Sequence, residues 1–501
     1  MKVNYLRIIQ ILSLLLFLSG SYFYLQAEMP AFPGAEGFGA DNPGGRGGRV
    51  IRVTNLNPDG PGSLQAACNE QGPRIVVFEV SGVIPATVSI PHGSITIAGQ
   101  TAPGAGITIQ GMLRGPEYNG VKDSTYINDV VVRFLRIRPT PGESVPGSDC
   151  DAIQLGRIDG VVIDHVSCSW ANDETIDIYV TRNVTIQWTT IEESDPTGHH
   201  KGQHNFGLIG GPKSWNASVH HCLFANHRRR NPAFANGPAD FRNNLVFNFR
   251  DGFSHEGHPP NGKGFNIIGN YYKAGPSDPN IFPFCFSDTV HYYLRDNYIE
   301  GVGMIQDPWR EADKLYGLRY YAHKGQMAPG EIPMPPVTTV PPQEVYPLVM
   351  ESAGCFPRDS VTRRTINELR EGKGEWRRRH PGDLMAGLIP GRPLADSDGD
   401  GMPDVWESAM GLDPTESGDH GTEMHSGYTA IEEYCNILAH RLVDTKGVMP
   451  VRGDVNGNGD MSAGDLFALL KIWMSGTHSW AADMDIDGEI SLRDISLWWD
   501  I

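Results

Sequence analysis

Short β-rich runs, many of them rich in valine and isoleucine, recur along the chain between about residue 95 and residue 300. Each run has the length of a β-strand, and no helical period joins one run to the next. Several starting points are similarly spaced: 161 to 184 is 23 residues, 218 to 241 is 23, 241 to 265 is 24 and 265 to 290 is 25. Two longer intervals, of 31 and 34 residues, would need loops inserted into the repeat. The runs lie at 95–97, 107–109, 130–134, 161–163, 184–186, 218–221, 241–245, 265–268 and 290–293.

A repeat of about two dozen residues without helical periodicity predicts a coil of parallel strands, in which each turn stacks on the last. Apolar side chains would fill the inside of the coil, and Asn and Gly would mark the bends. The alternative is a β-sandwich or a propeller, but a sandwich would show paired hairpins about 8–12 residues apart, and none is evident. We therefore predict an all-β chain built as a right-handed parallel β-helix, with small α-helical modules at the C-terminus.

The remainder of the chain divides by composition. Residues 331–347 are proline-rich and predict a non-regular segment wrapped around the coil, and 360–371 predict a short helix ended by Gly372. We expect a β-helix domain at 28–392, an acidic segment at 393–448 and a second acidic module at 450–501, after a linker around Met449-Pro450.

The N-terminus has the pattern of a secretory signal peptide. Lys2 and Arg7 precede an apolar run from Ile8 to Leu18, and Ala27 is a suitable cleavage point. The run is too short to span a bilayer comfortably, although an uncleaved anchor is the alternative. We expect residues 1–27 to be removed, leaving a secreted protein without a membrane span.

Charge and cysteine content indicate which ligands the protein could bind. The net charge is −18, and 391–501 carry 21 acidic and 6 basic residues, so −15 of it belongs to the tail. An acidic surface repels nucleic acid, and a tail with closely spaced aspartates is typical of bound calcium. The seven cysteines are scattered with no CxxC pair, which argues against zinc. Cys168 and Cys222 lie in apolar runs and are predicted to be core residues.

Acidic residues also gather within the repeat. Positions that are equivalent in successive turns of a coil become neighbours, so Asp149, Asp151, Asp173 and Asp177 could share one face. Clustered carboxylates repel one another unless a cation lies among them, and calcium is the natural occupant. The basic run Arg228-Arg229-Arg230 lies two turns further along.

Several ordered segments resemble the pectate lyases of polysaccharide lyase family 1. They are Phe32-Pro33-Gly34-Ala35-Glu36-Gly37-Phe38-Gly39, 96–104, the Ile-Asp-His at 163–165 and the Arg-x-Pro at 230–232. The resemblance covers about 31–374, and it implies a calcium-dependent enzyme that cleaves polygalacturonate by β-elimination.

The resemblance also implies roles for individual residues. Asp151, with Asp149, looks like a calcium ligand on one turn, and Asp173 and Asp177 look like ligands on the next. Arg230 looks like the catalytic base, whereas Asp164 and His165 look like a structural bend beside the site. An arginine is rarely neutral, so this assignment predicts an alkaline optimum, and the alternative role of the arginine run is to grip substrate carboxylates.

Two positions depart from the family pattern. The usual second arginine is replaced by Ala235, and the usual substrate-binding lysine is replaced by Asn205. His199, His200, Lys201 and His204 stand near the second position. We assign substrate binding to Lys201, His204, Arg228 and Arg229.

The tail contains three loops with the spacing of an EF-hand. The first has its acids at Asp396, Asp398, Asp400, Asp404 and Glu407, with Gly401 at the sixth position. The second and third begin at Asp454 and Asp483, and this pair resembles a type I dockerin, which implies a cohesin-like scaffold as a partner. Their predicted ligands are Asp454, Asn456, Asn458, Asp460 and Asp465, then Asp483, Asp485, Asp487, Glu489 and Asp494.

Other functions remain open on the same scaffold. A pectin lyase acts on methylated polymer and would not need the aspartate cluster. A non-catalytic adhesin or pectin-binding protein would not need Arg230 opposite that cluster. A glycoside hydrolase would need a pair of carboxylic acids with room for water between them.

Overall fold

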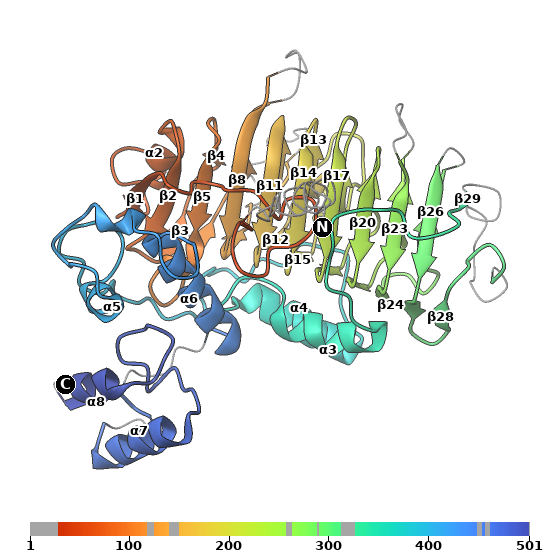
Figure 1. Ribbon diagram of the computed structural model, residues 1–501. Helices are drawn as coiled ribbons and strands as arrows, with labels where there is room; N and C mark the ends of the chain where they lie inside the picture. Colours follow the sequence, from red (N-terminus) through yellow and green to blue (C-terminus); the bar gives the residue numbers. More distant parts are fainter. Residues whose placement is uncertain are drawn as a thin grey trace, which may run out of the picture.

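The computed structural model describes residues 29–117, 125–139, 150–256, 263–287, 290–311, 326–447, 453–455 and 461–499. Its main body is a parallel β-helix, in which each turn of the chain adds one strand to each of three sheets, here named A, B and C (Figure 1). Apart from the antiparallel pair β27–β28, every strand pairing in the described residues is parallel. The predicted fold class is confirmed.

Sheet A is the longest of the three. Its strands are β1 (Arg49–Val53), β2 (Arg74–Phe78), β5 (Ile95–Ala98), β8 (Ile127–Arg133), β11 (Ile158–Asp164), β14 (Arg182–Gln187), β17 (Trp215–His220), β20 (Ala239–Arg242), β23 (Phe265–Ile268), β26 (His291–Arg295) and β29 (Gln326–Met327).

Sheet B consists of β3 (Gly82–Ile84), β6 (Ile107–Ile109), β9 (Leu135–Ile137), β12 (Ser167–Ser169), β15 (Thr190–Glu192), β18 (Leu223–Ala225), β21 (Leu245–Phe247), β24 (Tyr271–Lys273), β27 (Asn297–Ile299) and β28 (Gly303–Ile305). Sheet C consists of β4 (Val88–Ser89), β7 (Leu113–Arg114), β10 (Ile153–Gly156), β13 (Glu174–Tyr179), β16 (Phe206–Gly210), β19 (Ala233–Phe234), β22 (Asp251–His255) and β25 (Phe282–Cys285).

The core of the coil is a set of stacks of like residues. Val132, Ile163, Ile186 and Val219 are aligned across neighbouring strands of sheet A, and all are buried. The bends of the coil carry a stack of asparagines. The side-chain amide of Asn244 donates to Asn270, which in turn donates to Asn297. Cys168 and Cys222 are fully buried, as predicted.

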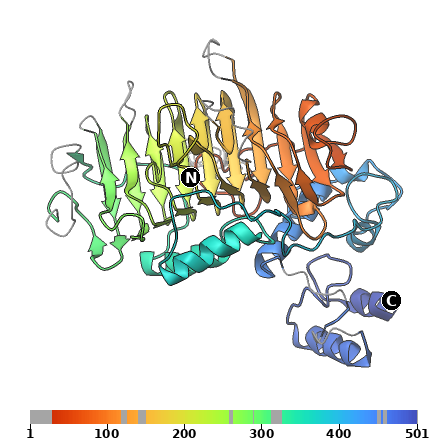
Figure 2. The same ribbon diagram turned by 180° about the vertical axis from the view of Figure 1, so that it is seen from behind.

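The helices lie outside the coil or after it. They are α2 (Leu64–Asn69), the short 3-10 helix η1 (Gly99–Thr101), α3 (Pro342–Ser352), α4 (Ser360–Glu371), α5 (Asp404–Met410), the 3-10 helix η4 (Asp419–Gly421), α6 (Ala430–Asp444), α7 (Ala463–Ser475) and α8 (Leu492–Trp499). Helices α3 and α4 cover the outer face of sheet B (Figure 2), where Val349 and Leu369 pack against Leu245 and Phe247. None of the described helices is long and apolar enough to cross a membrane.

The helix predicted at 360–371 is confirmed, and Gly372 ends it with φ +66°. The prediction of a non-regular segment over 331–347 is wrong for 342–347, because α3 begins at Pro342. A proline fits the first turn of a helix, where its missing N–H has no partner to lose. Residues 1–27 and the linker at Met449-Pro450 lie outside the described residues.

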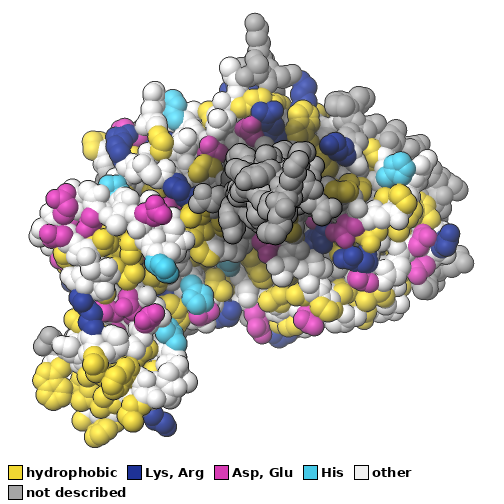
Figure 3. Space-filling view, viewed as in Figure 1, with side chains coloured by type: hydrophobic (Ala, Val, Ile, Leu, Met, Phe, Trp, Pro, Cys, Tyr) yellow, Lys and Arg dark blue, Asp and Glu magenta, His cyan; other side chains and the backbone are white. Residues whose placement is uncertain are grey.

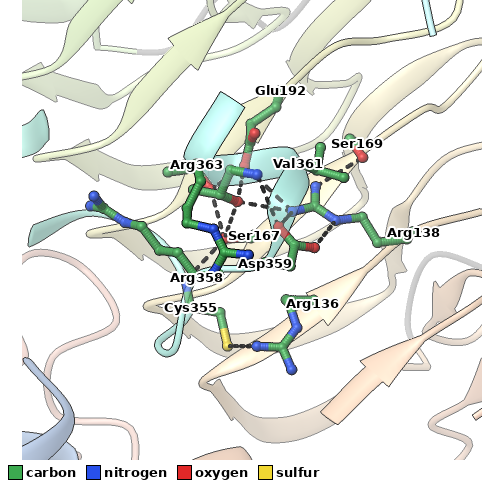
Figure 4. A network of polar contacts seen from close by, with 12 residues as sticks. Arg136, Arg138, Ser167, Ser169, Glu192, Cys355, Arg358, Asp359, Val361 and Arg363 are labelled. Carbon is green, nitrogen blue, oxygen red and sulfur yellow. Dashed lines mark hydrogen bonds and ion pairs between the residues drawn. The ribbon is translucent and has the colours of Figure 1, made fainter. Parts of the chain in front are cut away.

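A buried ion pair fixes α4 to the coil. Arg138 follows β9 and donates two hydrogen bonds to the carboxylate of Asp359, at 3.0 and 3.1 Å (Figure 4). Asp359 also caps α4 by accepting from the amide of Thr362, whose hydroxyl donates to Glu192. Removing one member of such a buried pair typically costs about 3–5 kcal/mol, since the other charge is left without a partner. The outer helices are therefore an integral part of the domain.

Candidate active site

A polar cleft of about 400 Å³ lies along sheet C. Its lining residues come from β7, β10, β13, the loop before β16 and the turn before β19, so neighbouring turns of the coil each contribute to it. They are Arg114, Glu117, Asp151, Gln154, Asp173, Glu174, Asp177, Tyr179, Lys201, His204 and Arg230. Both long intervals of the sequence repeat fall here, since their extra residues lie between β9 and β10 and between β15 and β16.

Acidic side chains form the floor of this cleft. Asp151, Asp173 and Glu174 each place a carboxylate oxygen within 4.8 Å of the others. Asp151 is buried and accepts hydrogen bonds from the amide nitrogen of Gln154 at 2.9 Å and from the backbone N–H of Glu174 at 3.1 Å. These bonds fix its carboxylate toward the cleft. Asp149 lies outside the described residues.

Asp177 is the least satisfied acid of the group. It lies beside Gln154 in the register of β10 and β13, is 4% exposed, and its Oδ1 has no hydrogen-bond partner. Burial, together with the charges of Asp151 and Asp173, raises the pKa of Asp177 well above its ordinary value. Buried carboxylates this close together fit a hard cation with oxygen ligands, and calcium suits such a set.

Arg230 faces this acidic floor from the turn before β19. It forms ion pairs with Glu174 and with Glu256, the latter at 3.2 Å, and its guanidinium lies 4.4 Å from the ring centre of Phe206. Its backbone is left-handed, with φ +59°, which costs a non-glycine residue about 1–3 kcal/mol and is found often at functional sites. The side chain of Asn231 holds the turn by donating to Asp251 O at 2.9 Å.

The predicted neighbours of Arg230 are oriented differently. Arg229 is directed away from the lining and pairs with Asp251 at 2.9 Å, and Arg228 is not among the lining residues. Burial, followed by the charges of Arg229 and Arg250, lowers the pKa of Arg228. The structure thus surrounds Arg230 with the carboxylates of Glu174 and Glu256.

Other basic side chains line the cleft. Lys201 and His204 line it, as does Arg114, which the sequence analysis missed. Arg114 donates to the amide oxygen of Gln154 at 3.2 Å, and the strand β10 lies between it and Asp177. His199 Nε2 lies 3.4 Å from Asp173 and His204 Nε2 lies 3.9 Å from it.

The two positions that depart from the family pattern are buried. Asn205 accepts from the backbone N–H of Arg228 at 2.7 Å and donates to Ser194 O at 2.6 Å, so it supports the arginine turn from behind. Ala235 is 1% exposed and also lies outside the cleft lining. Neither position lines the cleft, whose basic side chains lie at other positions.

Asp164 and His165 occupy a different corner of the coil, at the bend between sheets A and B. Arg133 donates to Asp164 at 2.8 Å, and His165 stacks on Phe134 with 4.8 Å between ring centres. Burial opposes the charge of Asp164, yet His165 and Arg133 hold its pKa well below the ordinary value. Their surroundings are those of a structural bend, and neither residue lines the cleft.

The tail loops show further acidic clusters. One comprises Asp396, Asp398 and Asp400, a second comprises Asp400, Glu407 and Asp419, and a third comprises Asp483, Asp485 and Asp494. Burial and the neighbouring acids raise the pKa of Asp400 to about 7 and that of Glu407 to about 8.

The remaining predicted tail ligands are not members of these three clusters. Asp404 accepts from the N–H and hydroxyl of Ser397 instead of joining a cluster. Asp465 and Asp454 are buried, Asp487 accepts from the N–H of Glu489, and Glu489 is exposed. Asn456, Asn458 and Asp460 lie outside the described residues.

Comparison with known proteins decides the family. The probable pectate lyase C of Aspergillus terreus is 37% identical over 432 residues, covering 81% of this chain and 94% of that protein. The probable pectate lyase C of Neosartorya fischeri is 36% identical over 419 residues, covering 81% and 93%. The chain belongs to the pectate lyases.

As a pectate lyase, the protein is an enzyme of the polysaccharide lyase class. No protein-family model matches the chain. Among solved structures, the cedar pollen allergen jun a 1 is 16% identical, with 67% of this chain and 97% of that chain covered at a TM-score of 0.44. A pectate lyase from Bacillus sp. N165, solved in complex with trigalacturonate, is 16% identical, with 64% and 98% covered at 0.39. The family assignment of this pectate lyase rests on the fungal relatives.

Proposed function

We propose that the protein is a secreted, calcium-dependent pectate lyase that cleaves (1→4)-α-D-galacturonan by β-elimination and releases unsaturated oligogalacturonides. The observation that carries this proposal is the acidic floor of the cleft, where buried Asp177 has an unpartnered oxygen beside Asp151 and Asp173. Cationic side chains around that floor suit a polymer that bears one carboxylate per sugar.

Asp151, Asp173 and Asp177 would hold the calcium ion. A bound calcium neutralises a uronate carboxylate and so eases the build-up of negative charge next to it. Arg114 and Lys201 lie on the rim and would bind the carboxylates of neighbouring sugars. Glu174 and Glu256 hold the guanidinium of Arg230 over the floor, which orients it toward the reacting sugar.

The elimination needs a base at one sugar carbon. Arg230 would remove the proton from C5 of a galacturonate, the electron pair of that C–H bond would form the C4–C5 double bond, and the C4–O bond would break. The leaving oxygen takes up a proton from solvent, and no water is added to the sugar. The product therefore carries a conjugated double bond, which a hydrolase cannot produce.

Chelation should abolish this activity, and added calcium should restore it. We expect the rate of ultraviolet absorbance increase on polygalacturonate to fall at least about 100-fold in excess chelator, because the acidic floor then repels the polymer. Highly methylated pectin under the same conditions is the control that distinguishes a pectate lyase from a pectin lyase, which acts on the methylated polymer. Full activity in chelator would refute the calcium mechanism, and absence of ultraviolet-absorbing product would refute the lyase chemistry.

Secretion is part of the proposal. Lys2 and Arg7 followed by the apolar run to Leu18 support it, as does a substrate found outside cells. Comparison of the N-terminal sequence of the mature protein with that of the gene product tests removal of residues 1–27.

We further propose that the C-terminal helices form a calcium-stabilised docking module for a cohesin-like partner. Large apolar side chains crowd its outer surface, at the lower left of Figure 3, and include Phe467, Met474, Leu492 and Trp499, each at least 65% exposed. A surface of this kind on a small module suits a protein partner.

A fragment spanning 450–501 should be largely unfolded in chelator and become helical with calcium. Asp483, Asp485 and Asp494 lie close together, and the small apolar interior around Leu469 cannot offset their repulsion. Far-ultraviolet circular dichroism with and without calcium measures this change. The variant Asp494→Asn should need more calcium, whereas Lys471→Gln, on the exposed side of α7, should not. A spectrum that calcium leaves unchanged would contradict the proposal.

A further inference from the structure

The acidic segment that follows the β-helix lies on the first strands of sheet A. Met402, Trp406, Ile431 and Leu438 share one apolar cluster with residues of β2 and β5, among them Val77. We name the stretch from 396 to 442 the clamp. In Figure 1 its helices α5 and α6 lie beside β1, β2 and β5.

Polar contacts extend the same interface. Arg46 forms an ion pair with Glu432 at 2.7 Å, and the amide of Gln100 donates to Cys435 O. Gly401 lies so close to the sheet that a side chain there would meet Val50 and Val77 at 2.8 and 3.0 Å. The clamp therefore covers the outer face of sheet A at the N-terminal end of the coil.

Five carboxylates converge within the clamp, and they come from three separate segments. Asp396, Asp398 and Asp400 lie on the loop against β1 and β2, Glu407 on α5, and Asp419 on η4 just before α6. Asp400 belongs to both triads whose oxygens lie within 4.8 Å of one another, so it links the loop to the two later acids. Acidic side chains gather at this end of the molecule in Figure 3.

Several carboxylate oxygens of this group have no hydrogen-bond partner. Glu407 is fully buried, and neither of its carboxylate oxygens has a hydrogen-bond partner. Oδ2 of Asp400, which is 4% exposed, and Oδ1 of Asp419 also lack one. A buried carboxylate without a partner is costly, and an all-oxygen set of this size suits calcium better than a soft metal.

We propose that Asp396, Asp398, Asp400, Glu407 and Asp419 bind one calcium ion, and that this ion locks the clamp onto sheet A and stabilises the β-helix independently of catalysis. Asp419 takes part although it lies outside the EF-hand spacing, and Asp404, which that spacing includes, is turned toward Ser397. The ion would join the loop on β1 and β2 to the segment that leads into α6.

The consequence is a link between calcium and the opening of the first turns. If the clamp must release calcium before β1 and β2 can open, bound calcium lowers the equilibrium constant for their opening. The factor is one plus the ratio of the calcium concentration to the dissociation constant of the site. Calcium at 10 to 100 times that constant would slow amide exchange there by about 10- to 100-fold. Strands far from the clamp, such as β23, should change little.

Hydrogen exchange of the full-length protein, read by mass spectrometry over 49–53 and 74–78, tests the proposal. In wild type, calcium should slow exchange in both segments relative to chelator. Glu407→Gln should lose the effect, as should Asp419→Asn, a milder change at the edge of the cluster. Glu416→Gln, which removes an exposed charge three residues before Asp419, should keep it.

Asp177→Asn separates this site from the cleft. Calcium should still protect β1 and β2 in that variant, whether or not the protein cleaves pectate. Equal exchange in calcium and chelator, protection that persists in both Glu407→Gln and Asp419→Asn, or loss of protection in Asp177→Asn would each overturn the proposal. Absence of lyase activity alone would leave it intact.

Discussion

Replacing Arg230 by alanine should lower turnover on polygalacturonate at least about 100-fold, the lower range for loss of a general base. The side chain lies over the acidic floor and is held there by Glu174 and Glu256. Its removal leaves the apolar stacks of the coil untouched but takes the ion-pair partner from buried Glu174, so the unfolding temperature should fall while the protein stays folded. The matched control is Arg229→Ala, which removes an identical group that pairs with Asp251 outside the cleft, and turnover should then stay within a few-fold of wild type.

The variant Arg230→Lys distinguishes a base from a group that only grips the polymer. Free lysine loses its proton near pH 10.4, about two units or more below arginine, so a lysine base would move the rising limb of the pH–rate profile to lower pH. A gripping residue would raise KM and leave the profile in place. Near-normal turnover in Arg230→Ala, or an unshifted profile in an active Arg230→Lys, would transfer the role of base to another residue.

The sequence repeat predicted one sheet of the coil well and the other two poorly. Eight of the nine β-rich runs lie on strands of sheet A, and the ninth, 107–109, is β6 of sheet B. Most sheet A strands are longer, and several hold consecutive apolar residues, such as Val130 to Val132. Sheet C strands alternate buried apolar residues with the polar side chains of the cleft, as Ile176 and Asp177 do, and β19 has only Ala233 and Phe234. Short polar strands do not stand out as runs.

Stacking of equivalent positions was enough to predict that Asp151, Asp173 and Asp177 would meet, and the structure brings them to one cleft. It could not predict Glu174, because alternation along the strand would direct that residue inward together with Ile176. Glu174 is the first residue of β13, and its carboxylate meets Arg230 instead. Glu256 and Asp419 belong to no motif, so only the folded chain places them.

Replacing Asp177 by asparagine should lower turnover at fixed calcium at least about 100-fold and raise the calcium concentration needed for half-maximal activity. The change keeps the size of the side chain but removes a buried charge whose Oδ1 has no hydrogen-bond partner. Stability in chelator should not fall, because the repulsion by Asp151 and Asp173 is relieved. Glu117→Gln removes one negative charge from the cleft rim, where Glu117 faces Arg114, and should have a much smaller effect.

The pH dependence of calcium binding gives this prediction a second measure. The raised pKa means that Asp177 keeps its proton at acidic pH when no ion is bound, and calcium must then displace that proton. Below the raised pKa, the half-saturating calcium concentration should therefore fall about tenfold for each unit of rising pH, and above it the dependence should level off. Calorimetric titration in buffers of different protonation enthalpy counts the released proton directly. Asp177→Asn should release about one proton fewer, and an unchanged proton count would show that Asp177 does not hold the ion.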